Sequence, residues 1–248
     1  MEESIWKSGS YVQPSAQILD GKCSCTKVAE EWLMKRMKFE KELSSFDYWD
    51  NLGIRLESVS MENGKVAHPF AYDDEISKEY KKYRTFTHGD PKQANLFFRK
   101  QSADTSDLEV GLIDFQWTGF GLAATDIAHF MTSAVHADRL VDGGEESLLQ
   151  YYFAELQKYL VEYGAYKDAD DAIEKYSYDT FMTQYDTGFL DICRLVIAYT
   201  WARFDEAVEK EDEEGCARTM NKTSYNKSIP NVVWLMSRCD EILTSRGV

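Results

Sequence analysis

Hydrophobic residues recur at the spacing of an α-helix over most of the second half of the chain. Between residues 145 and 163 they form a broad apolar stripe, rich in tyrosine and leucine. Shorter segments with the same period predict further helices over residues 170–183, 185–209 and 229–245. The charged run EKEDEEG (209–215) fits a solvated turn between helices. We expect a helical body with the aromatic side chains of the stripe in its core.

The first 82 residues carry one clear helical pattern. Thr26 is a candidate N-cap for a helix to about Ser45, whose apolar face holds Val28, Trp32, Phe39 and Leu43. The residues before it show no period and predict a loose N-terminal arm. After it, IRLESVS and KVAHPF flank the turn-like MENG and predict a β-hairpin, whereas DDEISKEYKKY predicts a short polar helix.

Three short segments rich in aromatic and β-branched residues follow, and they predict strands. They are YRTFT (83–87), NLFFR (95–99) and LEVGLID (108–114). The last two are joined by the polar stretch KQSADTSD and predict a β-hairpin. Gly119 and Gly121 then indicate a flexible connection, and Asp126 opens an apolar helix, DIAHFMTSAV.

Composition and charge narrow the classes of partner. Hydrophobic residues make up 44% of the 248 residues and aromatic residues 14%, as in a compact globular protein. The formal net charge of −15 argues against nucleic acid or an anionic membrane surface as a partner, and is compatible with a site for cations or a metal.

The cysteines and the lack of a long apolar run predict a soluble, cytoplasmic protein. The five cysteines are an odd number at wide spacing, and the first residues do not resemble a signal peptide. Cys23 and Cys25 form a lone C-x-C without a second ligand pair, which favours ordinary thiols over a zinc site. Asp191 and Arg194 interrupt the most apolar segment.

The stretch THGDPKQANLFF carries the most specific chemistry. It places His88, Asp90 and Asn95 on one short loop between two predicted strands. An aspartate there can orient or deprotonate an attacking hydroxyl group, and an asparagine oxygen is a hard ligand suited to Mg²⁺. LIDF adds a second carboxylate, Asp114, at the end of an apolar strand. Phosphoryl transfer depends on this kind of positioning and charge neutralisation.

HGDPKQAN followed by LIDF resembles the catalytic loop and metal-binding strand of kinase-fold small-molecule phosphotransferases. This group includes aminoglycoside phosphotransferases, choline kinases and the ecdysteroid kinase-like family. The ecdysteroid kinase-like family is the most similar of the three. The resemblance to it rests on Gln116, the GFGLAATDIAHF segment and the helical tail. Asp-Phe-Gln in place of Asp-Phe-Gly, and His-Gly-Asp in place of His-Arg-Asp, favour a small-molecule kinase over a protein kinase.

The resemblance implies a role for each loop residue. Asp90 would be the catalytic base or hydroxyl-orienting carboxylate, with Asn95 and Asp114 holding Mg²⁺ at the ATP phosphates. His88 would brace the loop. Lys92 would either contact the transferred phosphate or be an ordinary surface lysine. For Asp126 we favour a helix cap over binding to the backbone of the catalytic loop.

The resemblance also implies the fold. We expect an α+β fold, the protein-kinase-like large (C-terminal) lobe, mostly helical with a small β-hairpin at the catalytic loop. Residues 1–26 would be an N-terminal arm and 27–248 the lobe, with the catalytic loop and metal strand in 86–130 and a helical subdomain in 145–248. No G-x-G-x-x-G occurs, and too few residues precede His88 for a complete small lobe.

The function that these features imply is ATP- and Mg²⁺-dependent transfer of phosphate to a hydroxyl group of a small molecule. The alternative is a non-catalytic pseudokinase or truncated kinase lobe that acts as a binding or regulatory module. An abbreviated lid built from the N-terminal arm is a third explanation. The acidic charge favours a cationic acceptor, such as an amino alcohol or aminoglycoside, whereas the family resemblance favours a steroid-like alcohol.

Two further sets of residues are weaker candidates. His129 and His136 share a helix face but have no carboxylate at metal-ligand spacing, which favours ordinary packed or surface roles. An acceptor cleft in the helical body could be lined by Tyr185, Asp186, Asp191 and Trp201. No serine or cysteine has a recognisable orienting partner for a hydrolase triad.

Overall fold

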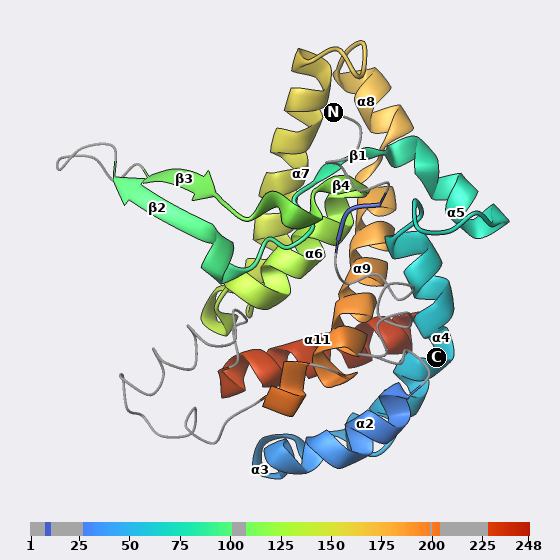
Figure 1. The fold of residues 1–248 in the computed structure, drawn as a ribbon, viewed down its shortest axis with the longest axis vertical. Helices are drawn as coiled ribbons and strands as arrows, with labels where there is room; N and C mark the ends of the chain where they lie inside the picture. The colour runs from blue at the N-terminus through green and yellow to red at the C-terminus, as the bar shows by residue number, and fades with distance from the viewer. Residues whose placement is uncertain (1–7, 11–26, 101–107, 199, 204–227) are drawn as a thin grey trace.

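The computed structural model describes residues 8–10, 27–100, 108–198, 200–203 and 228–248. Figure 1 shows a helical body from which one β-hairpin projects. The longer helices are α2 (Val28–Lys35), α4 (Leu52–Ala67), α6 (Ala123–Ala134), α7 (Gly144–Glu162), α9 (Tyr178–Ala198) and α11 (Ile229–Ser245). The shorter ones are α3 (Glu40–Leu43), α5 (Glu75–Tyr80) and α8 (Ala169–Lys175). The fold is α+β and mostly helical, as the sequence predicts.

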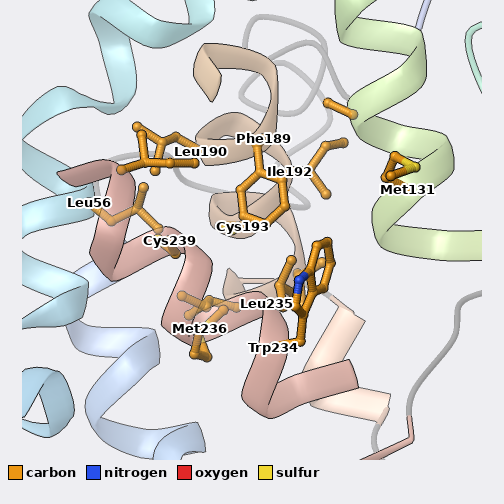
Figure 2. Close-up of a cluster of buried hydrophobic side chains, with 14 of the residues drawn as sticks. Leu56, Met131, Phe189, Leu190, Ile192, Cys193, Trp234, Leu235, Met236 and Cys239 are labelled. Atoms are coloured by element: carbon orange, nitrogen blue, oxygen red, sulfur yellow. The ribbon is translucent and has the colours of Figure 1, made fainter. Parts of the chain in front are cut away.

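Helix α9 runs through the middle of the body, and α2, α4, α6 and α11 pack against it (Figure 1). Every residue from Thr187 to Ile197 is buried, because neighbouring helices surround this part of α9. In Figure 2, Phe189 and Ile192 of α9 lie among apolar side chains of the other helices, including Leu56, Met131 and Trp234. Burying each side chain of this size stabilises the fold by about 1.5–3 kcal/mol.

The apolar face of the helix predicted over residues 26–45 is confirmed, but two helices take the place of the single one expected. A 3₁₀ turn, Arg36–Phe39, separates α2 from α3. The four predicted apolar positions, Val28, Trp32, Phe39 and Leu43, are all 0% exposed. Helix α4 crosses α2 closely at Gly53, where a Cβ atom would lie 2.5 Å from Trp32 Cβ. Only glycine allows this approach.

The hairpin predicted after this helix is wrong. IRLESVS, MENG and KVAH all lie in α4 or at its end. Leu52, Leu56 and Ser60 follow each other at four-residue spacing and are buried, as are Asn63 and Gly64 of the turn-like segment. Packing of this face against α9 outweighs the local turn preference. The short polar helix is confirmed as α5, capped by the Asp74 carboxylate, which accepts the Ser77 N–H at 3.0 Å.

Two small antiparallel sheets carry the loop of interest. The predicted hairpin is confirmed as β2 (Leu96–Lys100) paired with β3 (Leu108–Leu112). The flexible connection expected at Gly119 and Gly121 is instead a strand, β4 (Gly119–Gly121), paired with β1 (Thr85–Thr87). A Cβ atom at Gly121 would lie 2.7 Å from Thr87 Cγ2, so glycine permits this pairing.

Part of the expected loose arm is fixed to this second sheet. The Gly9 N–H donates to Phe120 O at 2.8 Å, and the Ser10 N–H donates to Trp117 O at 3.0 Å. Residues 8–10 are therefore buried against the strand that follows the candidate metal residue. The proposed C-x-C at residues 23–25, the polar turn at 101–107 and the charged run at 209–215 lie outside the described residues.

The later helices differ from the prediction mainly in their limits. The helix predicted over 145–163 is confirmed as α7, whereas α8 and α9 replace the helices predicted over 170–183 and 185–209. Helix α9 begins seven residues earlier than the second of these predictions, and residues 199 and 204–209 of that prediction lie outside the described residues. The aromatic stripe of α7 is only partly in the core: Tyr152, Phe153, Leu156 and Leu160 pack against it, but Tyr151, Tyr159 and Tyr163 are exposed. Within the described part of the chain, no helix combines the length and apolar character needed to cross a membrane.

Candidate functional site

The loop with the candidate catalytic residues connects β1 to β2 and lies against α6. It ends in a 3₁₀ turn, Gln93–Asn95, from which β2 continues directly. Its polar side chains point into the body, because His88, Asp90 and Asn95 are only 8%, 1% and 4% exposed. Burial of three polar side chains requires partners for their hydrogen-bonding groups.

Asp126 of α6 fixes the backbone of this loop. Its carboxylate accepts the N–H of His88 at 2.8 Å and the N–H of Gly89 at 3.0 Å. Gly89 has φ +83° and lies so close to Trp117 that a Cβ atom would be 2.2 Å from the Trp117 carbonyl oxygen. The expectation that Asp126 caps its helix is therefore wrong, since the N-cap is Leu122 and no side chain caps the helix.

Burying the Asp126 carboxylate at this position costs free energy, because the charged group loses contact with water. Burial raises its pKa above the ordinary value, although the two backbone N–H groups act in the opposite direction. A carboxylate in this environment needs hydrogen-bond donors to offset the cost of burying its charge. In this structure these hydrogen bonds hold the turn that places Asp90.

His88 braces the loop through both ring nitrogens. Nε2 donates to the Ile113 carbonyl oxygen at 2.8 Å, and Nδ1 accepts the Asp90 N–H at 3.3 Å. A carbonyl oxygen can only accept and an N–H can only donate, so this arrangement fits the neutral Nε2–H tautomer. The ring also packs against Phe115 with centroids 4.9 Å apart. These contacts tie the loop to the end of β3.

The two oxygens of Asp90 have different surroundings. Oδ2 accepts Lys92 Nζ at 2.5 Å and Asn95 Nδ2 at 3.3 Å, and Asn95 Nδ2 also donates to the Asp90 carbonyl oxygen at 2.9 Å. Oδ1 is buried and has no hydrogen-bond partner among the described residues. Burial raises the pKa of Asp90, while Lys92 acts to lower it. The carboxylate is thus held firmly on one side only.

Asp114 lies next to this loop but in a different environment. The Ile113 N–H donates to the Asn95 carbonyl oxygen at 3.1 Å, which brings the end of β3 against the loop. Asp114 itself is exposed and has left-handed backbone angles, φ 63° and ψ 59°. This conformation is uncommon outside glycine, and such residues cluster at functional sites. Its carboxylate accepts a long hydrogen bond from Gln116 Nε2 at 3.4 Å.

Asn95 and Asp114 fit a hard divalent cation of the Mg²⁺ type. The Asn95 amide nitrogen is directed at Asp90, so its oxygen is the atom suited to a cation. Together they offer one amide oxygen and one carboxylate. In the described part of the chain, no group of three or more His, Cys, Asp or Glu side chains could hold a metal. Mg²⁺ commonly takes one or two protein oxygens and completes its shell with phosphates and waters.

His129 lies next to Asp90, although its sequence pattern predicts only an ordinary packed or surface role. Its Nε2 is 3.8 Å from Asp90 Oδ1, and the side chains are 2% and 1% exposed. Burial, with the nearby positive charge of Lys92, lowers the pKa of His129 to about 3. The signal that could have found it is its spacing from Asp126, three residues earlier on the same helix face. His136 is exposed and pairs with Asp138 at 2.9 Å.

The four candidates for an acceptor cleft lie inside the helical body instead. Asp191 contacts His68 at 2.8 Å and Arg194 at 3.0 Å, and both side chains are buried with it. The Tyr185 hydroxyl donates to Glu145 at 2.8 Å, Asp186 accepts Arg238 at 3.0 Å, and Trp201 packs against Phe39. These residues stabilise contacts between helices rather than line an open site.

Comparison with known proteins gives one result. A family model described as the ecdysteroid kinase-like family matches residues 33–165, which is just over half of the chain. The matched segment contains the loop, Asp114 and α6 with Asp126 and His129. No curated protein and no solved structure matches the chain.

Proposed function

Because the chain belongs to the ecdysteroid kinase-like family, we propose that it transfers the terminal phosphoryl group of ATP to a hydroxyl group of a small molecule, with Mg²⁺. The observation that carries the proposal is the convergence of Asp90, Asn95 and Asp114. The first two share one buried loop, and the backbone of residue 113 is bonded to that loop at Asn95. Phosphoryl transfer needs this combination of an orienting carboxylate and oxygen ligands for metal.

Asp90 is proposed to orient the acceptor. Its Oδ2 accepts the hydroxyl proton as the acceptor oxygen bonds to phosphorus and the bond between that phosphorus and the leaving oxygen breaks. The elevated pKa that burial gives Asp90 suits a group that must accept a proton during the reaction. His88 and Asp126 contribute by fixing the backbone of the turn on which Asp90 lies.

Asn95 and Asp114 are proposed to hold Mg²⁺, which when bound neutralises charge on the nucleotide phosphates. Asp114 is exposed, so it is reachable by a nucleotide, and the preceding residue, Ile113, is hydrogen-bonded to the loop. Asn95 is fixed through its amide nitrogen to Asp90. The residue that orients the acceptor and one metal ligand are therefore coupled by hydrogen bonds.

Lys92 is proposed to exchange partners during the reaction. In this structure it neutralises Asp90, with Nζ 2.5 Å from Oδ2. That oxygen must be released before a hydroxyl group can use it. A phosphate close to Lys92 would compete for its ammonium group and free the Asp90 oxygen at the moment when the nucleotide is bound.

A second candidate function is binding without transfer. The observation that favours it is the burial of Asp90, which is 1% exposed and already occupied by Lys92 and Asn95. A pseudokinase of this kind would bind nucleotide through Asp114 and Asn95 but leave the acceptor hydroxyl unactivated. The transfer experiment below separates the two candidates.

The described body is proposed to be the large lobe of a kinase fold. The hairpin β2–β3 supports this assignment, because it carries the exposed apolar side chains of Phe97, Phe98, Leu108, Val110 and Leu112. A two-stranded ribbon with apolar residues is rarely stable by itself in water. In a complete kinase fold, a nucleotide-binding small lobe lies on the same side as the metal residues.

The proposal is tested by phosphate transfer from radiolabelled ATP to a panel of alcohols. The panel contains amino alcohols, aminoglycosides and steroid alcohols, and each is tested with Mg²⁺ and with chelator. We expect Mg²⁺-dependent labelling of one class, lost in Asp90→Asn and retained in Asp138→Asn, which changes an exposed aspartate. Transfer that persists in Asp90→Asn would contradict the proposed role, and nucleotide binding without any transfer would favour the pseudokinase.

A further inference from the structure

Helix α6 presents two side chains, Asp126 and His129, to the catalytic loop. Asp126 binds the loop backbone, as described above. His129 follows three residues later and therefore lies on the same face of the helix. Its ring approaches Oδ1 of the buried Asp90 carboxylate, whereas Lys92 and Asn95 bind Oδ2.

The Asp90 oxygen on this side lacks a hydrogen bond. Oδ1 has no partner among the described residues, and His129 Nε2 is 3.8 Å away. This separation is too long for a hydrogen bond but needs a closure of only about 1 Å to become one. Hydrogen bonds at catalytic sites are often long before ligands bind and shorten in the reactive complex.

The protonation state of His129 decides what it can do for Asp90. Its surroundings contain these charged or titratable groups: Asp90, Lys92 and His88 of the loop, His68 after α4, and Asp126 of its own helix. Burial and the positive neighbours keep the pKa of His129 near 3, so the ring is neutral at physiological pH. A neutral imidazole next to an acceptor-only carboxylate donates its single N–H. It is a poor proton acceptor here.

The packing around His129 includes a small empty space. A narrow cavity of about 10 Å³ lies beside its ring, with His68, Thr87, Thr125 and Asp126 in its lining. This is space for about one water molecule next to polar groups. The ring is therefore not closely packed on the side that faces this cavity.

We propose that His129 is a positioning residue for Asp90, donating its Nε2–H to Oδ1 and so directing Oδ2 toward the acceptor hydroxyl. This inference rests on the proposed phosphotransfer function and adds a residue to it. Once Lys92 releases Oδ2, this hydrogen bond would keep the carboxylate from rotating. His129 itself neither contacts the acceptor nor takes its proton.

The first test needs no turnover. The full chain is labelled with ¹⁵N-histidine, which gives signals from only four residues, and the signal of His129 is assigned from the loss of one signal in His129→Gln. We expect a neutral Nε2–H tautomer from pH 6 to 8, with an Nε2 shift that changes in Asp90→Asn. An Nδ1–H tautomer, a protonated ring, or no response to Asp90→Asn would overturn the proposal even if the chain transfers no phosphate.

The second test uses the transfer assay. A glutamine side chain can place an N–H donor near the position of Nε2, whereas leucine fills similar space without a donor. We expect His129→Gln to keep kcat within about 3-fold and His129→Leu to lose about 10- to 100-fold, with KM for ATP unchanged. His136→Leu is the control, since His136 is exposed. Equal losses in both His129 variants, or a change confined to KM, would indicate a merely structural residue.

Discussion

The two halves of the candidate site differ in how firmly the protein holds them. Asp90 lies in a loop whose backbone is held by Asp126 of α6. His88 and Asn95 add hydrogen bonds within the loop. Asp114, only a short distance away, is exposed at the end of a hairpin whose own side chains face solvent. The half that would orient the acceptor is preorganised, whereas the half that would meet metal and nucleotide is open.

This difference indicates that the helical body fixes the position of Asp90 but not that of Asp114. The rigid half rests on α6 and, through α6, on α9. The open half is the part where we propose that metal and nucleotide bind. Substitutions on the two sides should therefore separate effects on chemistry and stability from effects on nucleotide binding.

The largest effect should come from Asp90→Asn. An amide keeps the shape of the side chain but cannot accept the acceptor proton, so turnover should fall by about 10²- to 10⁴-fold. The melting temperature should not fall, because the buried carboxylate is replaced by a neutral group. The transfer assay and a thermal melt check the two parts, and a variant that loses both activity and stability would contradict the assigned role.

Asp191→Asn tests the buried charge network of α9, the helix on which α6 packs. Burial alone would raise the pKa of Asp191, but Arg194 and His68 hold it below the ordinary value of 3.8. Removing one charge from this buried group should destabilise the protein by about 3–5 kcal/mol at neutral pH. Because the pKa is lowered by folding, the stabilising charge is present above pH 3.8 and is lost as the pH falls through the folded-state value.

Chemical denaturation of the wild type and Asp191→Asn at several pH values measures this prediction. The difference in unfolding free energy should be full at pH 7 and should shrink below about pH 4. A difference that stays constant down to pH 3 would mean that the network does not depend on ionised Asp191.

Asp126→Ala should have the next largest effect. It leaves the N–H groups of His88 and Gly89 without their carboxylate partner and should cost about 2–3 kcal/mol of unfolding free energy. Asp138→Ala, which breaks an exposed contact, should cost no more than about 1 kcal/mol. Equal costs in urea denaturation of the two variants would argue that Asp126 does not fix the loop.

The smallest effect is expected in the hairpin. Phe98 is 61% exposed, so Phe98→Ala should change the unfolding free energy by less than about 0.5 kcal/mol. Phe189→Ala removes the same side chain from a position that is 0% exposed and should cost about 3–5 kcal/mol. A large loss of stability from Phe98→Ala would show that the hairpin is more closely packed than the structure indicates.

Much of the helical body could be predicted from the sequence, because apolar spacing reports burial directly. Val28, Trp32, Phe39 and Leu43 are buried as their spacing indicates. The error at residues 52–67 arose where a local turn signal, MENG, competes with distant contacts. The sequence does not show that Gly53 belongs to a helix, since that depends on the close approach of α2.

The candidate residues of the site could be named from the sequence, but the contacts that hold them in position could not. The order His88, Asp90, Asn95 and Asp114 was visible because these residues lie in two short segments of the sequence. The hydrogen bonds from the loop to Asp126 span nearly 40 residues, and the approach of His129 to Asp90 depends on the same contact. Such contacts are set by how α6 packs, which no local pattern reports.

The most direct test of the account is calorimetric titration of the chain with ATP, in the presence and absence of Mg²⁺. Asp114→Ala is compared with Asp138→Ala, which removes an exposed carboxylate outside the site. The account predicts Mg²⁺-dependent binding that is lost in Asp114→Ala and retained in the control, with no change in the melting temperature of either. Binding that is independent of Mg²⁺, binding that survives Asp114→Ala, or no binding at millimolar ATP would contradict it.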